Sequence, residues 1–323
     1  MTYFLHGIHV IYLPKMAIVK NRKLLLRGID DKGFAIKMNF MLKEKINHLF
    51  EEQLSEWELA KKNYNALEQI KTKTLVADGR EYRIQFNPAR IASSAAKVDA
   101  QSLRERKCFL CSNNLPPEQR GISFKEKYTI LVNPYPIFPR HLTVPAVEHT
   151  PQLIASRFGD MLDLAQQLDD YVVFYNGPKC GASAPDHFHF QAGNKGFLPV
   201  EKNRDKYKAI SIESDNKEEL LEHFQQIYDS LPLRPDDTEP MMNILTWYEL
   251  HQWMVCIFPR KKHRPSCYGE GETDLLISPG AVDLGGVFIT PLEKDFLKIT
   301  VEDITNILTE LRPANENSRA PDR

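Results

Sequence analysis

Two histidines and a glutamine alternate with phenylalanines in the segment His187-Phe188-His189-Phe190-Gln191. On a β-strand, residues two apart share a face, so the histidines and the glutamine are expected to line one wall while both phenylalanines enter the core. An imidazole that faces a phosphate can attack phosphorus and form a phosphoramidate, which divides one displacement into two. A half-buried strand whose histidines only satisfy hydrogen bonds is the alternative interpretation.

The loop ahead of this strand, residues 176–186, is rich in residues that can surround an anion. It contains the Asn176 amide, two glycines, of which Gly181 is the second, and the Ser183 hydroxyl. Backbone N–H groups, amides and hydroxyls can together hold a phosphate without net positive charge. This loop, followed by two in-line histidines and a glutamine, favours a phosphate-transfer site over the structural alternative.

The same residues resemble the motif of the histidine-triad superfamily, in the branch of galactose-1-phosphate uridylyltransferases, diadenosine tetraphosphate phosphorylases and GDP-hexose phosphorylases. The pattern His-x-His-x-Gln, preceded by an Asn and a Gly-x-Ser loop, falls on Asn176, Gly181, Ser183, His187, His189 and Gln191. The spacing from Ser183 to His187 is that of the phosphorylases, and Phe188 stands where the uridylyltransferases have proline. Weaker similarity around residues 133–145 and 243–260 makes the resemblance patchy from about residue 86 to residue 296.

The resemblance implies roles for two of these residues. His189 would be the nucleophile that takes a nucleoside monophosphate from the substrate, and its ring must be neutral to attack. Gln191 would hydrogen-bond a non-bridging oxygen of the transferred group, at a place where the hydrolytic members carry a third histidine. Because glutamine cannot supply a proton, transfer to an acidic phosphate is favoured over transfer to water. The resemblance therefore implies phosphorolysis or nucleotidyl exchange.

A second cluster of residues suits a metal. Cys108 and Cys111 have the C-x-x-C spacing of zinc knuckles, and His149 and His187 are available to complete a tetrahedral structural site. The uridylyltransferases that the chain resembles bind zinc with such a set, whereas other members of the branch do without metal. We expect zinc, since a bound His187 would also fix the strand that carries His189. Reduced thiols and a redox motif are the alternatives, and the redox motif lacks its β-α-β context.

Two basic stretches are candidate anion-binding segments. Arg90 and Lys97, with two serines between them, lie in an aperiodic, alanine-rich stretch near the cysteine pair, a composition that can clamp phosphates. Residues 260–264 form a dense basic run after a predicted strand. Lys261 or Lys262 is expected to meet the far phosphate or sugar phosphate if the two halves of the chain face each other. Solvated surface charge is the alternative for both stretches.

Hydrophobic periodicity predicts the elements that must position these residues. Apolar steps of three and four predict helices at residues 42–71, 150–169, 217–231 and 301–311. Alternating or β-branched runs predict strands at residues 74–76, 82–86, 128–132, 141–144, 171–175, 187–191, 209–212, 243–247 and 253–258. The stretch 87–106 and the proline-rich connector 133–140 are expected to be loops.

The order of these elements predicts an α+β protein: antiparallel sheets from two related histidine-triad-like halves, with helices packed outside and one shared cleft. The tetrapeptide Ile-Phe-Pro-Arg occurs at residues 137–140 and 257–260, which leaves both duplication and coincidence open. The expected divisions are an N-terminal strand or extension (1–41), a first half with the nucleophile strand and the zinc site (42–200), a second half (201–311) and a disordered tail (312–323).

Composition excludes several classes of protein. The chain has 323 residues, 42% hydrophobic and 26% charged, which is typical of a folded globular protein. Lys and Arg number 42 against 43 Asp and Glu, so the net charge of −1 offers no general field for nucleic acid or an anionic membrane. Five scattered cysteines and the lack of an apolar run of about 20 residues predict a cytoplasmic location without a membrane partner.

Together these features predict a nucleotidyltransferase or phosphorylase that acts on an NDP-sugar or a dinucleoside polyphosphate through a nucleotidyl-His189 intermediate. Its partners would be the nucleotide or nucleotide-sugar and, as acceptor, inorganic phosphate or a sugar phosphate. A non-catalytic, zinc-stabilised nucleotide-binding module of the same fold is the alternative, and nucleotide binding without exchange activity would favour it.

Overall fold

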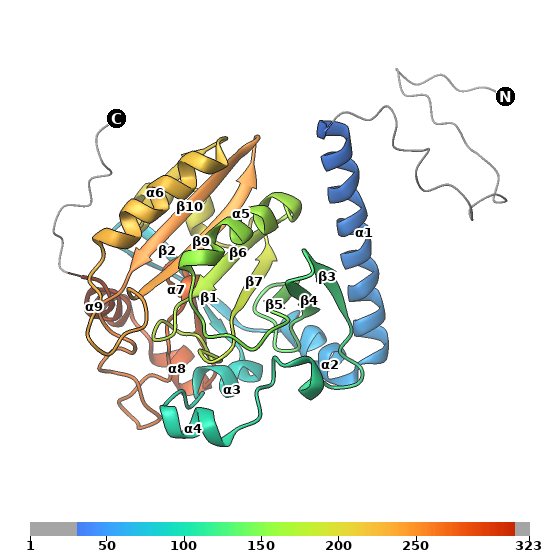
Figure 1. The fold of residues 1–323 in the computed structure, drawn as a ribbon. Coiled ribbons are helices and arrows are strands. Elements are labelled where there is room, and N and C mark those ends of the chain that lie inside the picture. The colour runs from blue at the N-terminus through green and yellow to red at the C-terminus, as the bar shows by residue number, and fades with distance from the viewer. Residues whose placement is uncertain (1–30, 314–323) are drawn as a thin grey trace, which may run out of the picture. The chain divides into compact units, whose positions relative to one another are not determined.

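One antiparallel sheet runs through the molecule (Figure 1). The structure is a computed structural model that describes the backbone of residues 31–313 and the side chains of residues 40–313. In sheet order its strands are β3 (Gly121–Phe124), β4 (Tyr128–Val132), β5 (His141–Pro145), β7 (His189–Asn194), β6 (Tyr171–Asn176), β9 (Met242–Glu249), β10 (Gln252–Pro259) and β8 (Ile210–Ser214). Every neighbouring pair is antiparallel, so the predicted α+β fold is confirmed.

Both faces of the sheet centre are buried, because alternate residues of β6 enter two different cores. Val173 and Tyr175 join a core that includes residues of α5 (Phe158–Gln167) and α6 (Lys217–Ser230). Val172 and Phe174 point the other way. Their core includes residues of a smaller sheet and of the C-terminal helices α8 (Glu293–Lys298) and α9 (Val301–Leu311).

The smaller sheet consists of β1 (Thr72–Ala77), β2 (Arg80–Phe86) and β11 (Val287–Thr290). The predicted hairpin at residues 74–86 is confirmed, with Asp78 and Gly79 at positive φ in its turn. The sequence pattern did not predict β11, which pairs parallel to β2 from about 200 residues away along the chain. Local periodicity carries no information about a partner that distant.

The helix predicted at residues 42–71 is two helices, α1 (Asp31–Glu56) and α2 (Glu58–Leu67). Trp57 between them has an extended backbone (φ −103°, ψ 99°) and its side chain is buried. The buried, extended Trp57 therefore divides a segment whose hydrophobic periodicity predicts one helix. Since α1 begins at Asp31, the last part of the expected N-terminal strand or extension is helical, and residues 1–30 lie outside the described residues, as does the expected tail beyond residue 313.

Several segments expected to be irregular contain short helical turns. The predicted loop at 87–106 contains the short helices α3 (Ile91–Ser94) and α4 (Ala100–Glu105). The predicted helix at 150–169 is shorter, since α5 begins only after a 3-10 turn. The short elements are η1 (Pro88–Arg90), α3 (Ile91–Ser94), α4 (Ala100–Glu105), η2 (Ser112–Asn114), η3 (Ala155–Arg157), η4 (Pro199–Glu201), η5 (Arg204–Tyr207) and α7 (Ala281–Leu284). Among the described residues, no helix has the length and apolar composition needed to cross a bilayer.

The repeated tetrapeptide does not occupy equivalent positions. Residues 137–140 lead into β5, whereas residues 257–260 complete and follow β10. The two predicted halves share one sheet, because β6 of the first pairs with β9 of the second. The tetrapeptide therefore gives no support for a common origin of the two halves, which stays a proposal.

Candidate active site

A cavity of about 710 Å³ lies at one end of β6 and β7 and is closed by residues from distant parts of the chain. This volume is in the range of small-molecule sites. The predicted catalytic and substrate-binding residues that line it are Arg90, Lys97, Asn176, Gly181, Ser183, His189 and Gln191. Lys261 does not line it and instead lines a second, smaller cavity. His187 is also absent from the lining, because β7 begins only at His189 and the predicted alternation does not extend back to His187.

His189 is held in one tautomer and one orientation. Its Nδ1 lies 2.9 Å from the carbonyl oxygen of His187, so Nδ1 carries the proton and donates it. Nε2 then bears the lone pair and has no partner among the described residues. Burial lowers the pKa of His189 to about 4, which keeps the ring neutral at physiological pH. A neutral imidazole with a free Nε2 in a cavity is equipped to act as a nucleophile.

Gln152 fixes the backbone around His189, and the sequence analysis missed it. Its Oε1 accepts a hydrogen bond from the backbone N–H of His189 (2.8 Å). Its Nε2 donates to the carbonyl oxygens of His189 (2.9 Å) and Asn176 (3.0 Å). One fully buried amide thus ties the start of β7 to the end of β6. A glutamine after a proline in a loop gave no sequence signal for this role.

His141 fixes the amide orientation of Gln191 and was also missed as a site residue. The backbone N–H of Ile137 donates to Nδ1 of His141 (3.2 Å), so the proton of this neutral ring is on Nε2. Nε2 lies 3.1 Å from Oε1 of Gln191 and donates to it. Burial holds the pKa of His141 well below its usual value. The NH₂ group of Gln191 is therefore left to donate into the cavity.

Asn176 is oriented in a similar way by the second half of the chain. Its Oδ1 accepts from Asn243 Nδ2 and from the backbone N–H of Ala281, both at 2.8 Å. Its NH₂ group is thereby left for the cavity, which it lines. Asn243 is held in turn by the guanidinium of Arg260 at 2.7 Å. Arg260 is buried, so the alternative of solvated surface charge does not hold for this first residue of the basic run 260–264.

Gly181 allows two loops to approach closely at the cavity wall. Its φ is +91°, and a Cβ at this position would lie 2.9 Å from Gly280 Cα and from Pro279 O. Only glycine meets both requirements without strain. The approach brings Ser183 and the segment from Ser278 to Asp283 to the same cavity.

Arg90 and Asp283 bring opposite charges to the lining of the cavity. Arg90 is anchored by a hydrogen bond to Tyr135 O (2.8 Å), and burial lowers its pKa to about 10, so it stays charged. Asp283, another residue without a sequence signal, accepts from the backbone N–H of Gly280 (2.8 Å). Burial raises the pKa of Asp283 to about 6. The exposed Lys97 adds a second cation at the rim.

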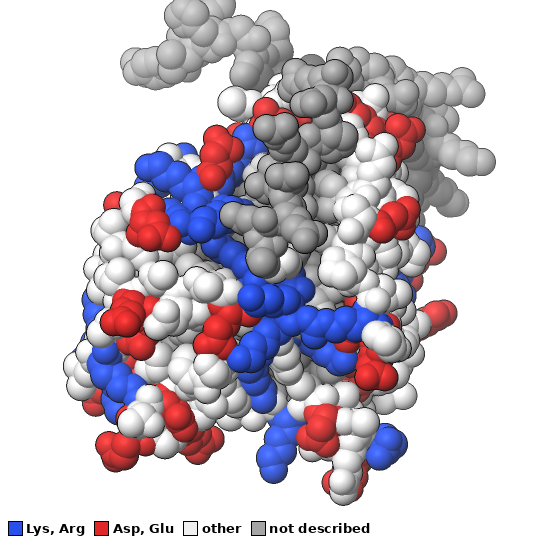
Figure 2. Space-filling model, turned by 90° about the vertical axis from the view of Figure 1, so that its left-hand side faces the viewer, with Lys and Arg blue, Asp and Glu red and all other residues white. Residues whose placement is uncertain are grey.

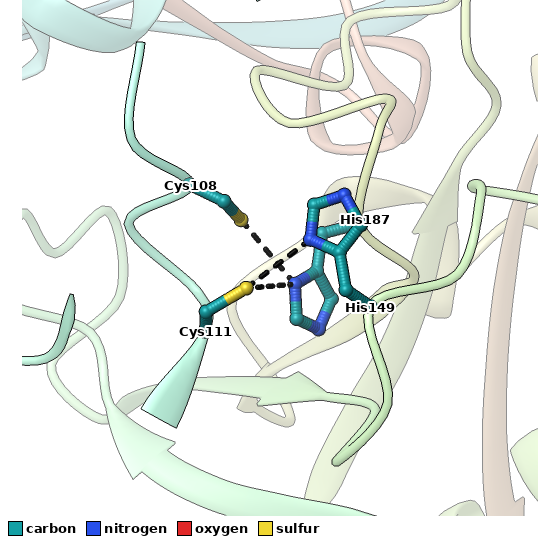
Figure 3. A group of neighbouring side chains, drawn as sticks. All are labelled: Cys108, Cys111, His149 and His187. Atoms are coloured by element: carbon teal, nitrogen blue, oxygen red, sulfur yellow. Dashed lines mark hydrogen bonds between the residues drawn. The ribbon is translucent and has the colours of Figure 1, made fainter. Parts of the chain in front are cut away.

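The predicted metal ligands meet beside this cavity (Figure 3). One ligand atom from each of Cys108, Cys111, His149 and His187 lies within 4.8 Å of all the others. Nδ1 of His187 is 3.3 Å from Cys108 Sγ and 3.5 Å from Cys111 Sγ, and Nδ1 of His149 is 3.1 Å from Cys111 Sγ. In a tetrahedral zinc site, bond lengths of about 2.3 Å to sulfur and about 2.0 Å to nitrogen put sulfur and nitrogen about 3.5 Å apart. The four residues fit such a metal.

Protonation in the cluster also suits a metal. Nε2 of His187 donates to Ala146 O (2.8 Å), so the lone pair of Nδ1 faces the two sulfurs. Burial opposes ionisation of Cys108, but the adjacent His187 ring and hydrogen bonds from the backbone lower the pKa of Cys108 to about 6. A thiolate and an oriented imidazole lone pair are what a metal ion requires.

The carboxylate of Asp186 lies next to the cluster and faces one of its histidines. Asp186 accepts from the guanidinium of Arg106, and its Oδ2 lies 3.9 Å from Nε2 of His149. Carboxylates that face the far nitrogen of a ligating histidine orient the ring and raise its basicity. Arg106 also lines the cavity, so the cluster of cysteines and histidines lies next to the cavity wall.

Residues 49–194 match the family described as a domain of unknown function (DUF4922). This segment contains the four cluster residues together with His189 and Gln191. A galactose-1-phosphate uridylyltransferase from Halalkalibacterium halodurans is 26% identical over 121 residues, which cover 32% of this chain. The match spans 24% of the length of that relative.

Two solved structures of yeast Ap4A phosphorylase are similar over most of their length. One has a TM-score of 0.52 at 16% identity and covers 79% of this chain and 96% of that chain. The other, in complex with Ap4A, has a TM-score of 0.55 at 18% identity and covers 84% and 97%. The fold of this chain is therefore similar to that of the yeast Ap4A phosphorylase.

Proposed function

We propose that this protein is a nucleotidyltransferase or phosphorylase that cleaves an NDP-sugar or a dinucleoside polyphosphate through a covalent nucleotidyl-His189 intermediate. The observation that carries the proposal is the neutral His189 ring, which lines the cavity with its Nε2 free beside the oriented amides of Gln191 and Asn176. The relatives support a nucleotide substrate, since one is named a uridylyltransferase and the yeast phosphorylase has been solved with AMP and with Ap4A.

The first step forms a bond between His189 Nε2 and the phosphorus of the nucleoside monophosphate. The bond from phosphorus to the bridging oxygen breaks, and the leaving phosphate or sugar phosphate departs with its electron pair. The ring gains positive charge as it attacks, and the Nδ1–H bond to His187 O stabilises this charge. Gln191, Asn176 and Ser183 donate hydrogen bonds to the non-bridging oxygens, where negative charge is concentrated.

The second step transfers the nucleotidyl group to an acceptor. An oxygen of inorganic phosphate or of a sugar phosphate attacks phosphorus, the bond to Nε2 breaks, and His189 returns to its neutral state. Arg90 and Lys97 would hold the leaving and accepting phosphates, because they supply the cations of the cavity lining together with Arg106. Gln191 has no proton to give or take, so an ionised phosphate is a better acceptor than water.

We further propose that Cys108, Cys111, His149 and His187 hold zinc. A bound zinc ion would act as a structural crosslink between the segments that carry these four residues. His187 connects this crosslink to the nucleophile, since its carbonyl oxygen orients His189. The metal would therefore position the nucleophile without contacting the substrate.

The test is a search for the covalent intermediate. The protein is mixed with labelled NDP-sugars or dinucleoside polyphosphates and quenched in alkali, where a phosphoramidate survives. We expect a labelled protein adduct that acid releases, and we expect His189→Ala to lose the adduct and at least about 10³-fold in turnover. Replacement of the exposed His48 by alanine is the matched control and should change neither.

The outcome also decides between this proposal and the non-catalytic alternative. Nucleotide binding with no adduct and no exchange for any substrate would favour a zinc-stabilised binding module. Full turnover by His189→Ala would show that the proposed mechanism is wrong. Phosphate-dependent release of product from a panel of NDP-sugars and dinucleotides would identify the substrate.

A further inference from the structure

A second cavity, of about 260 Å³, lies away from the proposed active site. None of its lining residues lines the larger cavity. Its walls come from the β1–β2 hairpin, the end of η5, the segment after β10 and α9. The lining residues are Ala77, Asp78, Arg80, Tyr82, Lys208, Lys261, Thr305, Leu308, Thr309, Arg312 and Pro313.

The charges around this cavity are unbalanced. Four of its lining residues are basic, namely Arg80, Lys208, Lys261 and Arg312, whereas Asp78 alone is acidic. Asp78 is already paired with Arg80 at 2.8 Å. Within residues 40–313, the side chains of the other three cations form no ion pair. Basic groups gathered without acidic partners repel one another, and an anion between them removes that cost.

Arg312 shows most directly that a partner is missing. One of its terminal nitrogens donates to Tyr207 O at 2.9 Å. Its Nε is buried and makes no hydrogen bond with the described residues. Burial lowers the pKa of Arg312, the neighbouring Tyr82 hydroxyl raises it in part, and the charge of Arg80 lowers it again. A buried guanidinium N–H without an acceptor is costly, and an oxyanion in the cavity could accept from it.

The backbone holds the cations at the cavity. Lys208 ends η5 in the left-handed conformation (φ +53°), which turns the chain at the cavity wall. The N–H of Lys261 donates to Leu311 O at 2.8 Å, so the segment after β10 is tied to the end of α9. Arg80 begins β2 and its side chain is only 7% exposed. Three separate segments thus bring their charges to one place.

The surface on this side of the molecule is also basic. Figure 2 views the molecule from the side on which α9 lies in Figure 1, and Lys and Arg side chains form a nearly continuous band across it. The chain as a whole has a net charge of −1, so this band is a local feature and does not reflect the composition. A local concentration of one sign of charge attracts ligands of the opposite sign.

We propose that this second cavity binds a small phosphate-bearing anion, either inorganic phosphate or a phosphate monoester. Guanidinium groups match the geometry of phosphate oxygens, and the two exposed lysines add charge at the mouth. The cavity is about a third of the volume of the larger one, which suits a phosphate or a small phosphorylated metabolite better than a dinucleotide. This proposal is independent of the reaction proposed for the larger cavity.

The test measures phosphate binding to the full chain by equilibrium dialysis with radiolabelled inorganic phosphate, and separately with labelled glycerol phosphate. The variant is Lys208→Gln combined with Lys261→Gln, because both side chains are exposed and folding should be unaffected. We expect it to lose one equivalent of binding, or at least about tenfold in affinity, for one of the two probes. Lys62→Gln, on an exposed face of α2, is the matched control and should bind like the natural chain.

Hydrogen exchange locates the binding. Phosphate should slow exchange in Val301–Leu311 and in the β1–β2 turn of the natural chain, and this protection should be lost in the double variant. Binding of inorganic phosphate alone identifies a site for the free ion, and binding of glycerol phosphate alone identifies a site for an ester; either supports the proposal. Unchanged stoichiometry and affinity in the double variant, or protection confined to the larger cavity, would overturn it.

Discussion

The proposed nucleophilic form of His189 depends on the hydrogen bonds of its other atoms. The His187 carbonyl fixes the proton on Nδ1, and Gln152 holds the backbone N–H and C=O of the same residue. The lone pair of Nε2 is consequently available without any movement of the ring. His141 does the same for Gln191, since a backbone N–H fixes its tautomer and its Nε2 then fixes the glutamine amide. Such preorganised groups need no rearrangement when charge develops in the transition state.

A buried carboxyl beside this network should make stability depend on pH. Glu239 accepts from the Ile154 N–H and from the Tyr175 hydroxyl, and burial raises its pKa to about 7 from an ordinary value of 4.5. A pKa raised in the folded state gives a stabilisation that is complete below pH 4.5 and is lost as pH rises through 7.

Glu239→Gln should therefore be more stable than the natural chain at pH 8, by about 2 kcal/mol, and the difference should shrink toward zero at pH 5. Urea unfolding at the two pH values measures this difference. Replacement of the exposed Glu222 by glutamine is the control and should change neither value. A constant difference at both pH values would contradict the assigned pKa of Glu239.

At the scale of elements, the proposed zinc site would join the loop that carries the two cysteines to the paired strands β5 and β7. Cys108 and Cys111 lie between α4 and η2, His149 follows β5, and His187 precedes β7. Loss of one ligand should release the His187 carbonyl that orients His189. Stability and activity are therefore expected to fall together.

Cys111→Ser should reduce bound zinc to less than about half an equivalent and lower the Tm by at least about 5 °C. Elemental analysis and thermal unfolding, in protein never exposed to chelator, provide the two measurements. Cys267→Ser is the matched control, because Cys267 is a free cysteine outside the cluster. If the natural chain itself carries less than about half an equivalent, the zinc proposal is wrong.

The approach of the Gly181 loop to the Pro279-Gly280 segment is the second feature at this scale. Gly181→Ala should cost both a strained positive φ and a backbone collision, or about 2 to 4 kcal/mol, and should displace Ser183 from the cavity. Gly196→Ala is a close control, because Gly196 has φ +81° and nothing within 4 Å of an added Cβ.

We expect Gly181→Ala to lose unfolding free energy beyond the loss in Gly196→Ala and to raise KM for the nucleotide. Urea unfolding and steady-state kinetics compare the two variants. If both variants lose the same unfolding free energy, the positive φ alone accounts for the loss and the close approach of the two loops does not contribute.

At the scale of the whole molecule, the two predicted halves depend on each other. The pairing of β6 with β9 lies inside the large sheet, and residues of both halves fill each of the two cores. The proposed active site is shared as well, since Ala281 and Asn243 orient Asn176 from the second half. Separation of the halves would expose apolar surface and an unpaired strand edge.

Residues 42–200 expressed alone should therefore lack fixed tertiary structure and aggregate. Near-ultraviolet circular dichroism and gel filtration test this, and coexpression with residues 201–323 should restore a soluble complex. A monomeric fragment with a cooperative unfolding transition would contradict the shared core and would restore the description of the halves as independent domains.

The sequence by itself determined much of the local structure. Strands such as β4, β9 and β10 and helices such as α6 and α9 lie close to the predicted ranges, because their periodicity depends on near neighbours. The small, polar loop before His187 and the C-x-x-C pair also predicted residues that the structure brings together in the cavity and in the cluster of cysteines and histidines. These signals are contained in short segments whose chemistry is visible without a fold.

Only the tertiary structure decided which residues share a site. Gln152, His141 and Asp283 have ordinary local contexts, and their roles arise from contacts with residues distant in sequence. The sequence predicted that Lys261 binds the substrate in the active site. In the structure its backbone N–H donates to Leu311 at the end of α9, and the residue lines the second cavity instead. The physical reason is the same in each case: side-chain hydrogen bonds and cavities form between segments, whereas periodicity records only the solvent exposure of each segment alone.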